Sequence, residues 1–285
     1  MKLTSIKHLK RVDDKNLREA LRHVQVIPRI DSYLEDMNLE DDNRELHCFS
    51  ASDLGDRTGR SLCGHYPMGC NRLLYYRYIG EQPERNFPPR LLRIFHTGTK
   101  IHEQLQGYLN EIARRSEGAD VFCDEVHVCP ENSKVANDLE INSTTDGLWE
   151  INVPKLQIRF LLEIKSIKAE LFQHISSKPN PENVVQTNVY MGCADVPLAN
   201  ILYYCKNDSV MAEFPIVFDP KIWQAIVDKI NFVRECAVND EPPPRETGFH
   251  CKQCRYKHIC KPPKTGGKRA ASYNRRKFSL NGASR

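Results

Sequence analysis

The stretch "FLLEIKSIK", residues 160–168, carries charged side chains inside an otherwise apolar run. Its content of β-branched and aromatic residues is typical of a β-strand. Residues two apart in a strand point to the same side, so Glu163 and Lys165 share one face and lie roughly 7 Å apart along the strand. The pair indicates either a solvent-exposed strand face with an ion pair or a functional site built on the strand.

The residues before this run sharpen the question, because "TTDGLWEI" at 144–151 has the pattern of a second strand. If the two strands pair antiparallel across residues 152–155, the numbers of opposed residues sum to about 307. Asp146 then lies on the same sheet face as Glu163, one diagonal step away. Two carboxylates at that distance repel each other unless a positive charge lies between them, and a divalent cation with oxygen ligands provides one.

The rest of the chain predicts helices around these strands. The expected elements are a short helix at 16–24, an acidic loop at 35–45, a long helix at 88–113, strands at 121–128, 139–151 and 160–168, a helix that starts at Pro181 with Asn180 as its N-cap, a hairpin that turns near 207–208, and a helix from 220. This order predicts an α/β fold with a central mixed β-sheet flanked by helices.

Composition sets the class of protein. The 285 residues are 40% hydrophobic and 27% charged, which predicts a packed core in one large domain or two small ones. The basic segment at 1–14 lacks the apolar stretch of a secretory signal, and no run reaches the roughly 18 apolar residues of a membrane span. We therefore expect a cytoplasmic chain with no membrane partner. Its eleven cysteines are then expected to include metal ligands rather than disulfides.

Asp146 followed by Glu163-x-Lys165 resembles the active-site pattern of the PD-(D/E)XK nuclease superfamily. Two further segments resemble the RecB-like branch of that superfamily: "FHTGTKIHEQLQ", which contains His102, and "QTNVY", which contains Gln186 and Tyr190. Each match taken singly also fits an ordinary surface, turn or helix residue. Their occurrence in the family's order carries the resemblance.

The resemblance implies a restriction-endonuclease-like core and a metal-dependent nuclease. One or two Mg²⁺ or Mn²⁺ ions would stabilise the transition state of phosphodiester hydrolysis. The implied roles are metal binding by His102, Asp146, Glu163 and the backbone carbonyl of Ile164, orientation of the attacking water by Lys165, and positioning of the scissile strand by Gln186 and Tyr190. A nitrogen ligand favours Mn²⁺ over Mg²⁺.

A group of cysteines near the end of the chain indicates a second metal centre. Cys251, Cys254 and Cys260 are spaced C-x2-C-x5-C, which supplies three thiolates and requires a fourth ligand from elsewhere. Cys63 is one candidate for the fourth ligand. A tetrahedral zinc site would also take four cysteines, and the nearby His250 and His258 make a mixed Cys–His zinc site possible. The other cysteines, such as those at 123, 193 and 205, are expected to be small core residues.

Cys70 is the other candidate, because "CNRLLYY" at 70–76 resembles the C-x-R-x-x-Y-Y segment of iron–sulfur nucleases in this superfamily. These include the CRISPR-associated RecB-like nucleases, the group that the chain resembles most together with its phage-borne relatives. In that group one N-terminal and three C-terminal cysteines hold a [4Fe–4S] cluster. The resemblance therefore implies that Cys70, Cys251, Cys254 and Cys260 join the two ends of the nuclease domain.

The resemblance also implies a biological role. The expected activity is that of a deoxyribonuclease, an exonuclease on single-stranded DNA ends in recombination, replication or CRISPR adaptation. An endonuclease, or a non-catalytic nucleic-acid-binding subunit of a recombination or CRISPR complex, is the alternative. No Walker A pattern is present, so unwinding would need a separate helicase.

Three regions follow from this interpretation. They are an N-terminal helical and acidic region at 1–47, the RecB-like nuclease domain with its cluster at 48–262, and a basic disordered tail at 263–285. Residues 261–285 hold eight Lys or Arg residues and no acidic residue. Such a tail either binds nucleic-acid phosphates or keeps the protein soluble.

Overall fold

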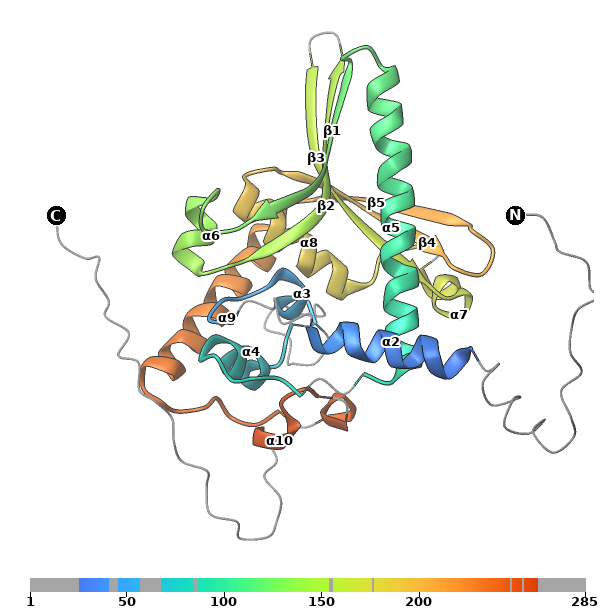
Figure 1. Ribbon diagram of the computed structural model, residues 1–285. Coiled ribbons are helices and arrows are strands. Elements are labelled where there is room, and N and C mark those ends of the chain that lie inside the picture. Colours follow the sequence, from blue (N-terminus) through green and yellow to red (C-terminus); the bar gives the residue numbers. More distant parts are fainter. Residues whose placement is uncertain are drawn as a thin grey trace, which may run out of the picture.

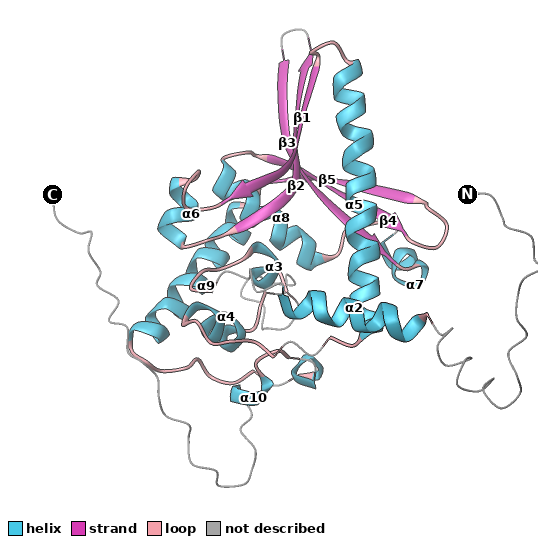
Figure 2. Ribbon diagram, in the orientation of Figure 1, coloured by secondary structure: helices cyan, strands magenta, loops and turns pink. Residues whose placement is uncertain are grey.

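A five-stranded mixed sheet forms the centre of the molecule, and helices lie around it (Figure 1, Figure 2). The computed structural model describes residues 26–40, 46–56, 68–84, 87–153, 156–175, 177–246, 248–252 and 254–260. The strands are β1 (Asp120–Val128), β2 (Ser143–Val153), β3 (Leu156–Ile167), β4 (Leu198–Cys205) and β5 (Met211–Val217). They lie side by side in chain order, with β3 and β4 parallel and the other neighbours antiparallel. The predicted α/β fold is confirmed.

Helices lie on both sides of the sheet and beyond its edges (Figure 1). They are α2 (Ile27–Glu40), α3 (Ala51–Leu54), α4 (Asn71–Tyr78), α5 (Pro89–Arg115), α6 (Lys134–Leu139), α7 (Ala169–Phe172), α8 (Pro181–Ala194), α9 (Pro220–Val238) and α10 (Lys257–Cys260), with 3₁₀ turns η2 (Gln173–Ile175) and η3 (Phe249–Lys252). Within the described part of the chain, no helix is both long and apolar enough to cross a membrane.

The middle of strand β3, residues 161–164, is buried on both faces, which explains the nearly continuous apolar run there. Leu162 packs in a cluster with Ile101 and Leu105 of α5. Leu161, the residue before it, packs in a different cluster with Val185 of α8. Neighbouring residues of a strand point to opposite faces, so α5 covers one face of the sheet and α8 covers the other.

The hairpin of β2 and β3 has a different register from the predicted one. Gly147 lies opposite Leu162 and Val153 lies opposite Leu156, so opposed residue numbers sum to 309 instead of 307. Strand β2 continues two residues further than expected, to Val153, while β3 begins at Leu156 as expected. A shift of two residues preserves the side on which each residue points, so the predicted shared face of Asp146 and Glu163 survives the error.

Several element boundaries differ from the predictions. The acidic segment at 35–40 is the end of α2, not a loop, because α2 packs against α5 and its Asp31 forms an ion pair with Arg93. The second strand begins at Ser143 and not at 139, since α6 occupies the preceding residues. The predicted helix at 16–24, Cys63 and the basic tail lie outside the described residues.

Two predicted helix starts agree with the structure in position. Helix α8 begins at Pro181 after Asn180, although the Asn180 side chain makes no capping hydrogen bond. The backbone N–H of Asn180 instead donates to the hydroxyl of Tyr203 at 3.0 Å, which attaches this helix start to β4. Helix α9 begins with a side-chain cap, since Asp219 accepts from the backbone N–H of Lys221 at 2.8 Å.

Candidate active site and cysteine pocket

Asp146 lies at an interruption of the β1–β2 ladder. The paired residues on either side are Asp124 with Gly147 and Val126 with Thr145, while Glu125, opposite Asp146, adopts a positive φ of 49°. Glu125 is a non-glycine residue in the left-handed region, so the backbone is locally strained there. The interruption frees the Asp146 peptide from the ladder and turns its groups toward other elements.

Three hydrogen bonds fix the position of Asp146. Its Oδ2 accepts from the backbone N–H of Ile164 at 2.6 Å, which ties the carboxylate to β3. Its Oδ1 lies 3.1 Å from Nδ1 of His102 on α5. Its backbone carbonyl accepts from Nε2 of Gln106 at 2.9 Å, one helical turn after His102. The carboxylate is therefore positioned by a strand and by a helix that lie far apart in the sequence.

Glu163 and Lys165 form a direct ion pair on the face predicted for them. Glu163 is only 3% exposed, so the explanation by an exposed strand face is wrong for this residue. Burial raises the pKa of the Glu163 carboxyl, and the nearby charge of Asp146 adds to that rise against the opposing effect of Lys165. For Lys165, burial disfavours the ammonium, but the charge and hydrogen bond of Glu163, together with the charges of Asp146 and Glu182, outweigh it and leave the pKa raised.

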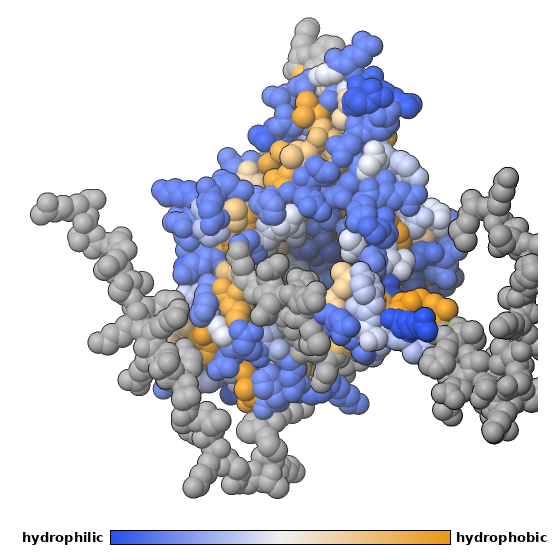
Figure 3. Space-filling view, in the orientation of Figure 1, coloured by the Kyte–Doolittle hydropathy of each residue, from blue (hydrophilic) through white to orange (hydrophobic). Residues whose placement is uncertain are grey.

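His102, Asp146 and Lys165 line one cleft of about 740 Å³, and Glu163 lies buried beside it in its ion pair with Lys165. His102 reaches it from α5, Asp146 from β2 and Lys165 from β3. The surface is hollowed beside α5, and hydrophilic side chains dominate that area (Figure 3). The fold thus brings together residues that are spread over 64 positions of the chain, as the sequence pattern required.

Gln186 and Tyr190 lie behind the carboxylates rather than in the wall of the cleft. Both are buried, and Nε2 of Gln186 donates to the Tyr190 hydroxyl at 3.0 Å. Burial raises the pKa of Tyr190 well above its usual value, and the charge of Glu163 adds to the rise. The structure therefore brings Tyr190 close to Glu163. A direct role of this pair on the scissile strand stays a prediction.

The donor atoms around Asp146 suit a divalent cation in type. Within the described ranges, no three His, Cys, Asp or Glu side chains are close enough together to hold a metal ion. In this cleft the His102 ring is instead paired with Asp146, and the Glu163 carboxylate is paired with Lys165. The buried Glu163 beside Asp146 is nevertheless the kind of carboxylate pair whose repulsion a cation relieves. The role of the Ile164 carbonyl stays a prediction.

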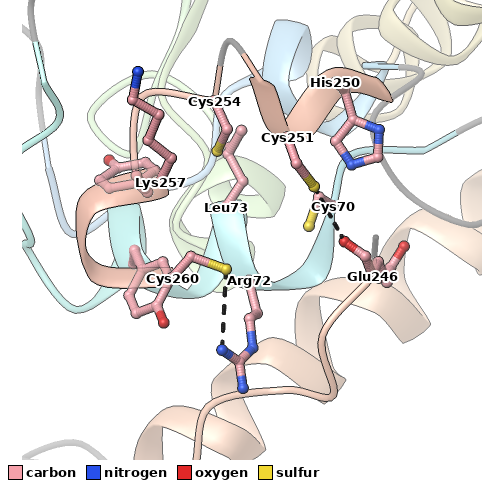
Figure 4. A pocket seen from close by; sticks show the side chains of 11 residues that line it. Cys70, Arg72, Leu73, Glu246, His250, Cys251, Cys254, Lys257 and Cys260 are labelled. Carbon is pink, nitrogen blue, oxygen red and sulfur yellow. Dashed lines mark hydrogen bonds between the residues drawn. The ribbon is translucent and has the colours of Figure 1, made fainter. Parts of the chain in front are cut away.

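The cysteines at the two ends of the domain line a single pocket (Figure 4). Cys70 precedes α4, Cys251 lies in η3, Cys254 lies in the loop before α10, and Cys260 is the last residue of α10. Hydrogen bonds hold two of the thiols: Cys251 donates to the backbone carbonyl of Glu246 at 3.6 Å, and Nη1 of Arg72 lies 4.0 Å from Sγ of Cys260. All four cysteines thus line one pocket, but within the described residues no three of them lie close enough together to hold a metal ion, so a shared metal centre stays a prediction.

The protonation of the thiols and a nearby buried charge bear on the fit of this pocket to a negatively charged metal–thiolate centre. Burial raises the pKa of the Cys70 and Cys254 thiols, so a metal must displace their protons. Lys229 of α9 is 1% exposed, and its Nζ has no hydrogen-bond partner among the described residues. Its nearest charged neighbours include Glu246 and Cys70. A buried ammonium without a partner beside this pocket fits a centre that carries negative charge when metal is bound.

The remaining cysteine and histidine predictions have mixed outcomes. Cys193 and Cys205 are buried, as expected for small core residues, but Cys123 on β1 is exposed. His250 lines the cysteine pocket, so a mixed Cys–His zinc site stays open. His258 is not among the lining residues, and its Nδ1 lies 3.7 Å from Glu84.

Two cleft residues were missed by the sequence reasoning. Gln106 shares a helix face with His102, because it follows four residues later, and this spacing was the available signal. Lys206 lines the cleft directly after β4 and carries no motif that would have identified it. Both residues reach the cleft only because α5 and the end of β4, which are distant in the sequence, pack together there.

Comparisons with known proteins give limited information. No protein-family model matches the chain, and no curated protein matches it. Among solved structures, SSO0001 has a TM-score of 0.46 and 14% identity over 83% of this chain and 97% of its own. An alkaline exonuclease, LHK-Exo from Laribacter hongkongensis, has a TM-score of 0.46 and 16% identity over 68% of this chain and 90% of its own, also in a complex with dAMP. Because these TM-scores lie below 0.5, we draw no inference from them.

Proposed function

We propose that this chain is a metal-dependent deoxyribonuclease that acts as an exonuclease on single-stranded DNA ends. The observation that carries the proposal is the meeting of Asp146, Glu163, Lys165 and His102 around one cleft. The sequence pattern predicted that these residues, which lie on one long helix and two strands, come together. Surface residues without a shared function are not expected to gather in this way.

The burial of Glu163 adds support from energetics. Its carboxylate is buried, while the Lys165 side chain is 27% exposed at the cleft. Taking a charge out of water costs several kcal/mol, and attraction to a partner charge offsets that cost only in part. A protein that merely binds nucleic acid gains nothing from such a pair, since exposed lysines attract phosphates equally well. The pair therefore favours a catalytic role over a non-catalytic binding subunit.

The residues have distinct roles in the proposed reaction. Asp146, Glu163 and His102 would hold Mg²⁺ or Mn²⁺. When bound, the cation supplies charge stabilisation at the phosphate and lowers the pKa of the attacking water. Lys165, a compact cation at the wall of the cleft, would orient that water and offset phosphate charge. The hydrogen bonds from Ile164 and Gln106 keep Asp146 in place during the reaction.

The cysteine pocket would hold a [4Fe–4S] cluster with a structural function, with zinc as the alternative metal. The four thiols would be the ligands, and the buried ammonium of Lys229 would oppose their negative charge. A cluster held in this way joins α4 to the C-terminal segment at η3 and α10. A cytoplasmic setting and a helicase, recombination or CRISPR partner in a phage or cell are further parts of the proposal, supported by the sequence resemblance.

The test uses the purified metal-loaded protein with end-labelled linear single-stranded DNA, circular single-stranded DNA, duplex DNA and RNA, each with Mn²⁺ or Mg²⁺. We expect digestion of the linear single strand from its ends, with the circle intact. Asp146→Asn should abolish the activity, while Asp124→Asn on exposed β1 is the matched control. Cutting of the circle would indicate an endonuclease. Tight binding with no cleavage of any substrate would indicate the non-catalytic alternative.

A further inference from the structure

One wall of the active-site cleft has no role in the proposed chemistry. Ile94 and Phe95, on the N-terminal half of α5, line the cleft and are 41% and 48% exposed. Phe95 packs edge to face against Phe87 at a ring-centroid distance of 5.4 Å, so its ring is supported from one side. A supported but exposed aromatic ring in the wall of a polar cleft is available to stack on a flat partner.

The position of this ring along α5 relates it to the hydrolytic centre. Phe95 precedes His102 by seven residues, which places the two on the same helix face about 10 Å apart along the axis. Gly98 lies between them. A Cβ at Gly98 would lie 3.4 Å from Oγ of Ser166 and 4.0 Å from Nζ of Lys206, so the helix passes close to the ends of β3 and β4 there.

Lys206 supplies a cation at this crossing. Its backbone N–H donates to the carbonyl of Ile167 at 2.8 Å, which fixes it at the end of β3. Its Nζ forms no hydrogen bond or ion pair with any residue that the structure describes, although the side chain is only half-exposed and burial lowers its pKa. A lysine held in this way beside a cleft is placed to receive an anion from outside the protein.

We propose that Phe95 and Lys206 form a binding subsite for one unpaired nucleotide next to the scissile phosphodiester. The base stacks on Phe95, with Ile94 at its edge, and the phosphate of the strand contacts Nζ of Lys206. A base inside a duplex is already stacked and paired and cannot reach a helix wall, whereas every unpaired base offers a flat face. The subsite deepens the proposed function, on which it rests, by explaining a preference for single-stranded ends.

The test separates binding from hydrolysis. Binding of a fluorescent single-stranded oligonucleotide is measured by anisotropy in the Asp146→Asn background without divalent cation, so loss of cleavage does not affect the readout. Phe95→Ala should weaken binding by about 5- to 100-fold, as removal of one stacked base does. Phe95→Trp should restore it. Tyr108→Ala, an exposed aromatic on the same helix outside the cleft, is the control and should have no effect.

Lys206→Met should change a different property. One fewer phosphate contact lowers the magnitude of the slope of log affinity against log salt by about 0.7 for a single strand. Phe95→Ala should leave that slope unchanged. Lys221→Met, an exposed lysine of α9, is the control and should also leave the slope unchanged.

A single abasic nucleotide moved along the oligonucleotide locates the subsite. In the presence of Phe95, the abasic nucleotide should weaken binding at one position near the bound end, and this penalty should vanish in Phe95→Ala. Unchanged affinity in Phe95→Ala, or an equal loss for fully paired duplex, would overturn the subsite even if the protein cleaves DNA. Absence of cleavage in the parent protein, with these binding effects intact, would reject the proposed function instead.

Discussion

Gln106 donates from Nε2 to the backbone carbonyl of Asp146 at 2.9 Å, and this side chain is 6% exposed. The carbonyl cannot pair across the β1–β2 ladder, because the ladder is interrupted at Glu125 and Asp146. The helix thus supplies the hydrogen bond that the sheet does not. Gln106 acts on the proposed chemistry by positioning Asp146 and does not itself reach a reacting atom.

Replacement of this side chain tests the positioning role. Gln106→Ala leaves a buried acceptor unsatisfied, which costs about 1–3 kcal/mol of stability. A small displacement of Asp146 should also lower kcat by roughly 10- to 100-fold, with KM for DNA nearly unchanged. Gln104→Ala, an exposed residue of the same helix, is the control for stability and rate. An equal fall in stability with normal kcat would show that Gln106 is only structural.

Removal of one charge or of both charges of the Glu163–Lys165 pair should change stability differently, while every such variant should lose activity. Lys165→Met leaves a buried carboxylate without its partner, and Glu163→Gln leaves the ammonium without its anion, so each should unfold at a lower temperature than the parent. The double variant Glu163→Gln/Lys165→Met removes both charges and should be at least as stable as the parent. All three should lack nuclease activity, and the losses should not add, because the residues act as one unit. A double variant less stable than both singles would contradict the buried-charge account.

The sequence predicted that Asp146, Glu163 and Lys165 lie close together on the sheet, and the reason is local chemistry. The alternation of Glu163 and Lys165 with apolar neighbours fixes which side of β3 they occupy, whatever the register. That is why an error of two residues in the hairpin still placed Asp146 beside Glu163. The end of β2 could not be deduced in the same way, because Asn152 and Val153 fit the end of a strand as well as the start of a turn.

Features set by tertiary contacts were beyond the sequence reasoning. The acidic end of α2 is helical because the helix packs on α5, a contact that no local pattern announces. The burial of Glu163 comes from tertiary packing, and the buried Tyr190 of α8 lies close enough for the charge of Glu163 to raise its pKa. The unpartnered Lys229 is visible only once α9 is packed beside Cys70. In each case the deciding neighbour is distant in the sequence.

The cysteine pocket predicts that metal stabilises the whole domain. Cys70 and Cys251 are 181 residues apart, and closing so long a loop costs several kcal/mol of chain entropy. Metal–thiolate bonding offsets this cost, because binding free energy becomes folding free energy when the site is absent from the unfolded chain. Serine in place of any one of Cys70, Cys251, Cys254 or Cys260 should remove the brown colour of an iron–sulfur cluster and lower the melting temperature.

Metal analysis and two further variants complete this test. Cys236→Ser, at a half-buried cysteine outside the pocket, should change neither colour nor stability and is the control. Cys63→Ser should also leave the colour intact. A colourless native protein with one bound zinc ion would replace the cluster by a zinc site with the same stabilising role. A coloured Cys70→Ser variant beside a colourless Cys63→Ser variant would show that Cys63 is the fourth ligand.

The buried Lys229 side chain predicts that its replacement changes the stability of the metal-free protein and the retention of metal by the loaded protein. In the metal-free protein its buried ammonium has no hydrogen-bond partner among the described residues, so Lys229→Met should raise the melting temperature of the metal-free form. In the loaded protein the same change removes a positive charge near Cys70, so it should weaken metal retention against a chelator by about 10-fold. Lys229→Met should therefore stabilise the metal-free form and weaken the metal-loaded form. A purely steric role of the side chain would not produce these opposite effects.

Redox measurements make the test of Lys229 more specific. A reduced iron–sulfur cluster carries one more negative charge than the oxidised cluster, so loss of the nearby ammonium destabilises the reduced form more and should lower the reduction potential. Lys221→Met, at an exposed position of the same helix, is the matched control and should leave the potential unchanged. If zinc occupies the pocket, chelator competition alone is the readout. An unchanged potential, or for zinc an unchanged affinity, in Lys229→Met would show that this lysine does not oppose the charge of the centre.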